Sequence, residues 1–433
     1  MRTRPIVLIA AALSLQTSRA QDSLTVEEAV RKALEHHPAI ELALRNTEVS
    51  EARVLQSTVS EYPTVSAEAF YMRLGPVAAL SIPMLGDFKL YPENNYDAHI
   101  GARYTLYDFG RTGAAVDLSR SRVRTSEDAW ELTKTALTFQ TIRAFYTVLL
   151  LEKSLRVQDE QIQALEAHLV VTEKKLNAGT TTRFDVLTTR VRVAMAQNQK
   201  IDLENALDHQ ETILRQLLSL PGGSAVAVKG EFRQYPLGVD TDSLMALALH
   251  QRTESKIVHD AGRSAELQYK VASLGRMPSL KLSANYGLKN GFIPNIDVLR
   301  GNYAAGMQIE LPVFDGKRVE YQEEESRAQL RAEEARAKDV EQQIRSDVEQ
   351  VVADAKAAVA KLRITDLQLQ QAGEAVALAR SRYENGTLTN LDLLDAEAAE
   401  SAAKLMNLQA LYRLVMSRFE QLRSVGAEPI GAD

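Results

Sequence analysis

Two aspartates near the C-terminal end of the chain are spaced so that their carboxylates could act together. Asp392 and Asp395 are three positions apart, which places both side chains on one face of a helix. Carboxylates held together in this way favour cations and repel anions. Acidic residues near a helix start are also favoured by the helix dipole alone. The sequence leaves both interpretations of this pair open.

No residue pattern typical of an enzyme accompanies these carboxylates. The chain has no cysteine and 7 scattered histidines, which excludes thiolate sites and gives no histidine-based metal constellation. It contains no Ser-His-Asp arrangement and no phosphate-binding loop that opens a βαβ unit. The net charge is −6 without basic clusters, so nucleic-acid binding is not expected. We predict a protein that is not an enzyme, with no cofactor and no metal site.

The carboxylates belong to a motif that the chain uses twice. Gly179 and Asp185 recur 207 positions later as Gly386 and Asp392. A repeat of this length is far too long for a solenoid unit, so one structural half is used twice. Further residues that recur at the same offset are Thr180 with Thr387, Thr182 with Thr389, Leu187 with Leu394 and Arg111 with Arg318.

Each half is predicted to contain one very long helix. Residues 112–177 and 317–384 contain no proline and are rich in good helix formers. At 1.5 Å per residue each helix would be about 100 Å long. Gly179 and Gly386 are expected to end them, and Pro38 marks a kink in an earlier helix. Shorter helices are expected over residues 25–62, 183–219, 240–277 and 391–424.

Four segments alternate strictly between apolar and polar residues, for example Leu280 to Leu288. This period predicts strands with one apolar face. Their length, about 9–11 residues, suits a tilted transmembrane strand, although two soluble hairpins are the alternative. Four strands cannot close a barrel, so the membrane interpretation predicts several chains that share one. The loops over residues 72–95 and 289–301 are expected to be the variable, exposed ends, and the first is the longer.

The N-terminus has the pattern of a secretory signal peptide, with Arg2 and Arg4 before an apolar run and Ser18-Arg19-Ala20 as the cleavage site. An apolar N-terminal helix is the alternative. The predicted divisions are a signal peptide (1–20), a first repeat (21–220, with strand pair 64–107 and tip turn 177–183), an equatorial linker (221–239), a second repeat (240–425, with strand pair 279–311 and tip turn 384–390) and a C-terminal tail (426–433).

Together these features resemble the TolC-like outer-membrane efflux proteins, over essentially all of the mature chain. The most specific part is the tip motif, from Gly179 to Leu187 and from Tyr383 to Asp395. The Tyr107–Arg111 and Phe314–Arg318 junctions also resemble the strand-to-helix hinges of that family. The resemblance implies a mainly α fold with a membrane β-barrel. In a homotrimer, four strands per chain would form a shared 12-stranded barrel, continued by a long-helix α-barrel.

The resemblance also implies a function in the cell outer membrane, with the helical part in the periplasm. The protein would be the exit duct of a tripartite efflux or type I secretion system, a passive conduit gated at its periplasmic helical tip. Its partners would be two further copies, a periplasmic adaptor protein, an inner-membrane transporter of the RND or ABC type and outer-membrane lipid. A soluble periplasmic or surface coiled-coil structural protein is the alternative, which predicts strands that stay in water.

Site residues follow from the same resemblance. Asp392 and Asp395 match an acidic ring at the channel entrance, and Asp185 and Tyr383 match positions that hold the closed gate. One position departs from the family, because Leu388 stands where some relatives carry arginine. A salt bridge from that position to Asp185 therefore does not carry over, and Arg183 or Arg190 are the candidate substitutes. The residues matching the adaptor contact are Gly179, Thr180, Gly386 and Thr387.

Overall fold

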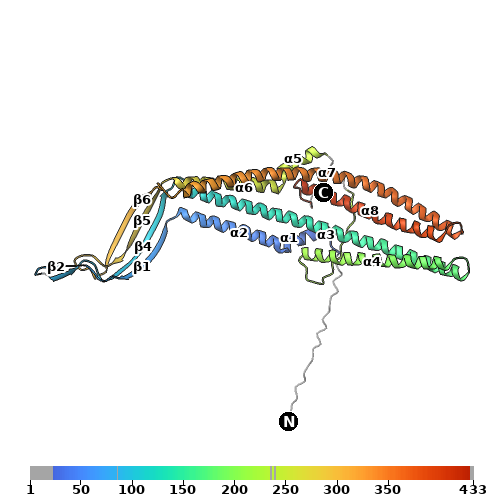
Figure 1. Ribbon diagram of the computed structural model, residues 1–433, viewed down its shortest axis with the longest axis horizontal. Helices are drawn as coiled ribbons and strands as arrows, with labels where there is room; N and C mark the ends of the chain where they lie inside the picture. The colour runs from blue at the N-terminus through green and yellow to red at the C-terminus, as the bar shows by residue number, and fades with distance from the viewer. Residues whose placement is uncertain (1–22, 85, 235–236, 238–239, 430–433) are drawn as a thin grey trace, which may run out of the picture.

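The molecule is elongated, with a sheet at one end and long helices that extend away from it (Figure 1). The computed structural model describes residues 23–84, 86–234, 237 and 240–429. The expected signal peptide (1–20) lies outside these residues. Among the described residues, no helix is both long and apolar enough to cross a membrane.

Four antiparallel strands form the main sheet, in the order β1-β4-β5-β6. The expected alternating segments are confirmed as strands, and the pairing of β4 with β5 joins the two halves of the chain. The strands β1 and β6 are the two edges of this sheet. The bounds are β1 Thr64–Arg73, β4 Asn94–Tyr107, β5 Ser279–Lys289 and β6 Arg300–Glu310.

The two faces of the sheet differ in chemistry, as the alternation predicts. Rows of paired residues across the strands are alternately apolar and polar. Tyr286 and Tyr303 lie on the apolar face and are 70% and 82% exposed. A continuous exposed apolar face of this kind marks a surface that another molecule or a membrane covers. Two neighbouring rows are Ala67, Ile100, Tyr286, Tyr303 and Glu68, His99, Gly287, Asn302.

The loop between β1 and β4 contains regular structure that the sequence did not predict. It contains a second, two-stranded sheet, in which β2 (Ala79–Ile82) pairs with β3 (Gly86–Lys89). These strands have four residues each, which is too short for an alternating pattern to stand out.

Two helical hairpins make up about half of the chain. The long helices α3 (Arg111–Asn177) and α7 (Arg318–Glu384) have 67 residues each. They are followed by α4 (Arg183–Leu217) and α8 (Asn390–Ser424), with 35 residues each. The predicted bounds of all four are confirmed to within about two residues. Both hairpin turns lie at the end of the molecule opposite the sheet (Figure 1).

The helices that lead into the strands are each broken once. In the first half α1 (Val26–His36) and α2 (Pro38–Thr58) meet at His37, at the kink that Pro38 predicts. In the second half α5 (Thr241–Gln251) and α6 (Thr253–Ser273) meet at Arg252, where the backbone is extended. The expectation of one continuous helix over residues 240–277 was wrong, because ion pairs of the buried Arg252 side chain hold this break, which no proline marks in the sequence. Arg252 is 8% exposed and contacts Asp347 of α7 at 2.8 Å.

The largest hydrophobic core lies at mid-height, where several segments cross α3. Phe145 and Ile142 of α3 pack there against Leu214 of α4 and Val415 of α8. A parallel bridge between Leu24 and Val228 brings the start of the chain beside the segment after α4. Away from this core, neighbouring helices contact each other along narrow strips, and the hairpin tips lie beyond it.

Candidate gate at the helical tips

Both hairpin turns are fixed by the same backbone arrangement. Gly179 has φ +73° and Gly386 has φ +74°, a left-handed conformation that favours glycine. The amides of Gly179 and Thr180 donate to carbonyls in the last turn of α3, both at 2.9 Å. Gly386 and Thr387 repeat these two bonds at the end of α7, at 3.1 and 2.9 Å. The predicted helix-ending role of both glycines is confirmed.

The first aspartate of each tip motif closes a capping box at the start of the following helix. The carboxylate of Asp185 accepts from the backbone N–H of Thr182 at 3.0 Å and from its hydroxyl at 2.6 Å. These bonds, with the Thr182 hydroxyl contributing most, hold the pKa of Asp185 below its usual value. Asp392 accepts from the N–H and hydroxyl of Thr389 in the same way, at 3.2 and 2.5 Å. Both carboxylates therefore stabilise their own helix starts.

Asp395 lies on the same exposed face of α8 as Asp392 but contacts the other hairpin. Its side chain is 59% exposed and forms an ion pair with Arg192 of α4 at 2.8 Å. Leu393 and Leu394 are buried inside the tip. The structure thus places the two predicted ring residues together on the exposed face of α8. Arg192 offsets part of the negative charge of Asp395.

Tyr383 is buried between the two hairpins rather than bonded to Asp185. It is 7% exposed, with the Lys175 ammonium 3.9 Å from its ring centroid and the His168 ring 5.1 Å away. Its hydroxyl has no hydrogen-bond partner among the residues that the structure describes. The side chain of Leu388 packs against the apolar cluster that contains Tyr383. Of the two candidate substitutes, Arg190 is paired with Glu173 of α3, at 2.7 Å.

Sequence alone did not single out a buried polar cluster that lies next to Tyr383. His168 of α3 is 8% exposed, and its Nε2 lies 2.7 Å from Asn390 Oδ1 of α8. The Asn390 amide nitrogen donates to Thr189 Oγ1 and to the backbone carbonyl of Asp185, both at 3.3 Å. Because Asn390 Oδ1 can only accept, His168 Nε2 carries the proton. The cluster joins α3, α4 and α8, and polar residues on an otherwise apolar helix stripe were its only signal in the sequence.

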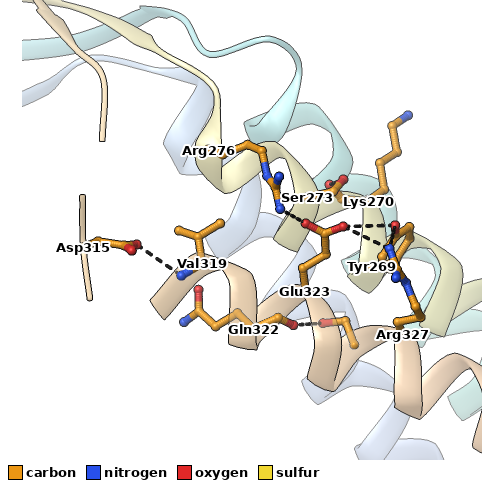
Figure 2. Close-up of polar contacts among 10 residues, drawn as sticks. Tyr269, Lys270, Ser273, Arg276, Asp315, Val319, Gln322, Glu323 and Arg327 are labelled. Atoms are coloured by element: carbon orange, nitrogen blue, oxygen red, sulfur yellow. Dashed lines mark hydrogen bonds and ion pairs between the residues drawn. The ribbon is translucent and has the colours of Figure 1, made fainter. Parts of the chain in front are cut away.

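The opposite ends of the long helices are also fixed by polar contacts. Figure 2 shows Glu323 of α7, whose carboxylate accepts hydrogen bonds from Arg276, Tyr269 and Arg327, the last two at 3.2 Å each. Asp315 accepts from the backbone N–H of Val319 at 3.1 Å. The first half repeats this last bond between Asp108 and Thr112, at 2.8 Å. Each strand-to-helix junction is therefore held by an aspartate, as expected for a hinge between the sheet and a long helix.

The polar face of the sheet continues into a hollow of about 860 Å³. Polar strand residues such as Gln308 and Arg103 line it together with Arg111 and Arg318, the first residues of α3 and α7. A separate depression on the other face is lined mainly by apolar residues, among them Ala102, Leu282, Ala284 and Met307. The sheet is therefore polar on the face that lines the hollow together with the helix starts, and apolar on its opposite face.

Comparison with known proteins decides the family. The model for outer membrane efflux proteins matches residues 29–220 and 258–425. The chain belongs to this family. It is 24% identical to the alkaline protease secretion protein AprF of Pseudomonas aeruginosa, over 72% of this chain and 66% of that protein. It is 21% identical to the outer membrane protein TolC of Vibrio cholerae, over 72% of each.

The match spans less than two thirds of two curated relatives, namely 66% of AprF and 58% of the proteases secretion protein PrtF of Dickeya chrysanthemi. Solved structures give the fold over a longer span. The outer membrane protein VceC of Vibrio cholerae has a TM-score of 0.79 and 19% identity, over 93% of this chain and 96% of that one. The Campylobacter jejuni outer membrane channel CmeC has a TM-score of 0.82 and 15% identity, over 93% and 85%.

These matches confirm the predicted TolC-like fold, with long helices and a main sheet of four strands in each chain. Membership of the outer membrane efflux protein family also confirms the predicted location, the outer membrane with the helical part in the periplasm.

Proposed function

We propose that this outer membrane efflux protein is the exit duct of a tripartite efflux or type I secretion system, a passive conduit gated at its helical tip. The observation that carries the proposal is the sheet, which is apolar and exposed on one face and polar on the hollowed face. An apolar outer face and a polar inner face are what a membrane-spanning channel wall requires. Relatives named for protease secretion and for cation efflux support both kinds of system.

The two edges of the sheet call for closure between chains, and the family resemblance implies that three chains share the barrel. In lipid, unpaired backbone groups at β1 and β6 would each cost several kcal/mol, on the order of the penalty for a buried unsatisfied polar group. The strand order makes β6 antiparallel to β1, so β6 of one chain can pair with β1 of the next. Three chains would then close a barrel without edges.

The gate is proposed to lie at the tip turns, with Asp392 and Asp395 as its acidic ring. In a trimer these exposed residues would bring six carboxylates near the channel axis, where they would attract cations. Tyr383 and Asp185 are proposed to brace the closed tip from within, Tyr383 through its packing between the hairpins and Asp185 through its helix cap.

The tip turns are also the proposed docking site for a periplasmic adaptor protein. An added Cβ at Gly179 or Gly386 would meet nothing within 4 Å, so both turns are open to close approach. Thr180 and Thr387 lie next to them and present exposed hydroxyl-bearing side chains. An inner-membrane transporter of the RND or ABC type would complete the system.

The membrane assignment can be tested with neighbouring residues on opposite faces of β5. Ala284→Arg places a charge on the apolar face, which costs about 2–4 kcal/mol near the bilayer midplane. We expect it to remove the protein from the outer-membrane fraction, whereas Asn285→Arg, on the polar face, should still assemble. The alternative of a soluble coiled-coil protein expects Ala284→Arg to remain folded without detergent. That result would overturn the channel proposal.

The acidic ring can be tested by conductance in planar bilayers. Replacing Asp392 and Asp395 with Ala should weaken the block of the pore by added divalent cations. Because Asp392 also caps α8, Thr389→Val is the matched control, which disturbs the same cap and keeps both charges. Unchanged cation block in the double variant, or an equal loss in the control, would remove these carboxylates from the gate.

A further inference from the structure

Two arginines occupy matching positions where the strands lead into the long helices. Arg111 is the first residue of α3, and Arg318, 207 positions later, is the first residue of α7. A cation in the first turn of a helix is unfavourable, because the helix dipole is positive there. The chain nevertheless places arginine at this position twice, so the stability of the helix starts does not explain the pair.

Neither arginine holds the junction between strand and helix. The backbone N–H groups of Thr112 and Val319 are already bonded to Asp108 and Asp315, at 2.8 and 3.1 Å. Both helix starts are therefore satisfied without a guanidinium group. Within the part of the chain that the structure describes, neither guanidinium has an ion-pair or hydrogen-bond partner, and both residues are exposed.

Both arginines line the hollow of about 860 Å³ on the polar side of the sheet. Sites for small molecules have similar volumes, roughly 300–1,000 Å³. Of the other charged lining residues, Lys281 pairs with Glu310, and Arg103 pairs with Glu68 at the margin. The one remaining carboxylate, that of Asp108, is bonded into the start of α3. Two unpaired guanidinium groups therefore outweigh it and leave the hollow with a net positive charge.

The same side of the helices continues this positive charge away from the sheet. Positions 11 apart, about three turns, lie on one face of a helix. Arg122 of α3 and Gln329 of α7 follow the two helix-start arginines at this spacing and line a second hollow, of about 460 Å³. The charged residues that line it are Arg53, Arg122 and a single carboxylate, Glu333. The excess of arginine is therefore a property of this whole face and not of one position.

We propose that the hollow between the sheet and the helix starts is a binding site for small multivalent anions, one in each chain, with the guanidinium groups of Arg111 and Arg318 as its ligands. As a site inside a duct, it rests on the channel proposed above, in which the polar face of the sheet is the inner face. Guanidinium groups bind carboxylate and phosphate through paired, charge-assisted hydrogen bonds. The duct then binds anions where the helices meet the sheet, whereas the acidic ring attracts cations at the tip.

Citrate, a small trianion, is the probe for this site. Calorimetric titration of the detergent-solubilised protein at low salt measures its binding and does not require a conducting channel. In planar bilayers, citrate added on the side of the sheet measures access from inside the duct, as block of conductance. Arg111→Gln with Arg318→Gln removes both guanidinium groups and keeps polar side chains.

The chain offers a matched control, Arg124→Gln with Arg331→Gln. These exposed arginines are also related by the offset of 207 and lie on the same two helices. They follow the first pair by 13 positions, which places them about 220° further round each helix, on another face. Both double variants remove the same number of positive charges, so any general effect of net charge is the same in both.

We expect one citrate for each wild-type chain. The dissociation constant should rise at least about tenfold in the first double variant and less than about twofold in the control. Citrate block should weaken in the same order, while block by divalent cations, assigned to the tip, should stay unchanged. Thermal unfolding of the first variant should not fall below that of the wild type, because a cation is removed from the positive end of each helix.

Three results would overturn the site while leaving the channel in place. They are a conducting wild type that binds no citrate, equal citrate affinity in the wild type and the first variant, and an equal loss of affinity in the control. A wild type that does not conduct overturns the channel instead. Citrate bound to such a protein through the two arginines would show that the anion site is not part of a duct.

Discussion

The two helical hairpins have the same backbone but different side chains where they meet. Their long helices have 67 residues each, their short helices 35 each, and their turns end on glycines at φ +73° and +74°. Where the hairpins meet, the first contributes His168, Thr172 and Thr189, and the second has alanine at the matching places. The duplicated backbone builds two matching hairpins, and side-chain divergence alone gives their contact surfaces different chemistry.

The largest difference between the halves is expected at Asn390 and its counterpart Arg183. Asn390→Ala removes the 2.7 Å partner of the buried His168 Nε2 and one of the two hydrogen bonds of Thr189 Oγ1, and should destabilise the tip by about 2–3 kcal/mol. Arg183 is exposed, so Arg183→Ala should change tip stability by less than about 0.5 kcal/mol. Hydrogen exchange of tip amides in the detergent-solubilised protein measures both. Equal effects would contradict the expected difference between the two halves.

The helix breaks at His37 and Arg252 give a second comparison of the two halves. Arg252→Ala removes three charge-assisted bonds from a buried side chain, one to Asp347 and two to Glu254, and should cost about 2 kcal/mol. His37→Ala removes a single bond, from the N–H of Ala39 to Nδ1, and should cost about 1 kcal/mol. Thermal unfolding in detergent ranks the two variants. A larger loss for His37→Ala would show that Pro38 does not suffice to hold the first break.

The helix caps should behave alike in both halves. Thr182→Ala and Thr389→Ala each open one capping box, and each should cost about 1 kcal/mol. Because Asp185 has a lowered pKa, the stability from its cap is present at neutral pH and is lost as pH falls through that lowered pKa. Unfolding measured from pH 7 down to pH 3 checks this. A clear inequality at pH 7 would mean that the two tips differ in backbone stability as well as in their side chains.

The smallest effect is expected at Asp128 of α3, whose counterpart in the second half is Ala335. Burial, and then the charge of Asp260, raises the pKa of Asp128. Stability is then highest below the unfolded pKa and is lost as pH rises through the raised value. Asp128→Asn should therefore stabilise the protein at pH 7 by less than about 1 kcal/mol and have no effect near pH 3. A loss of stability at pH 7 would show that the carboxylate is needed in its charged form.

The sequence predicted those parts of the fold that rest on local patterns. Alternation over Leu280 to Leu288 indicates a strand without any knowledge of its partner, and the repeat identifies Gly179 and Gly386 as equivalent turns. The break at Arg252 was not predictable, because Asp347, which holds it, lies 95 positions away. The bond between His168 and Asn390 spans 222 positions, so no local pattern indicates it. The gate roles of Asp392, Asp395, Asp185 and Tyr383 stay predictions.

The most direct test of the channel is the mass of the protein after extraction from a native host. The membranes are fractionated, the outer-membrane fraction is solubilised in detergent, and light scattering gives the protein mass in the complex. We predict a trimer in the outer-membrane fraction, because shared closure pairs the edges of β1 and β6 and the family resemblance implies three chains. A single chain that stays soluble without detergent would contradict the channel and leave a coiled-coil structural protein.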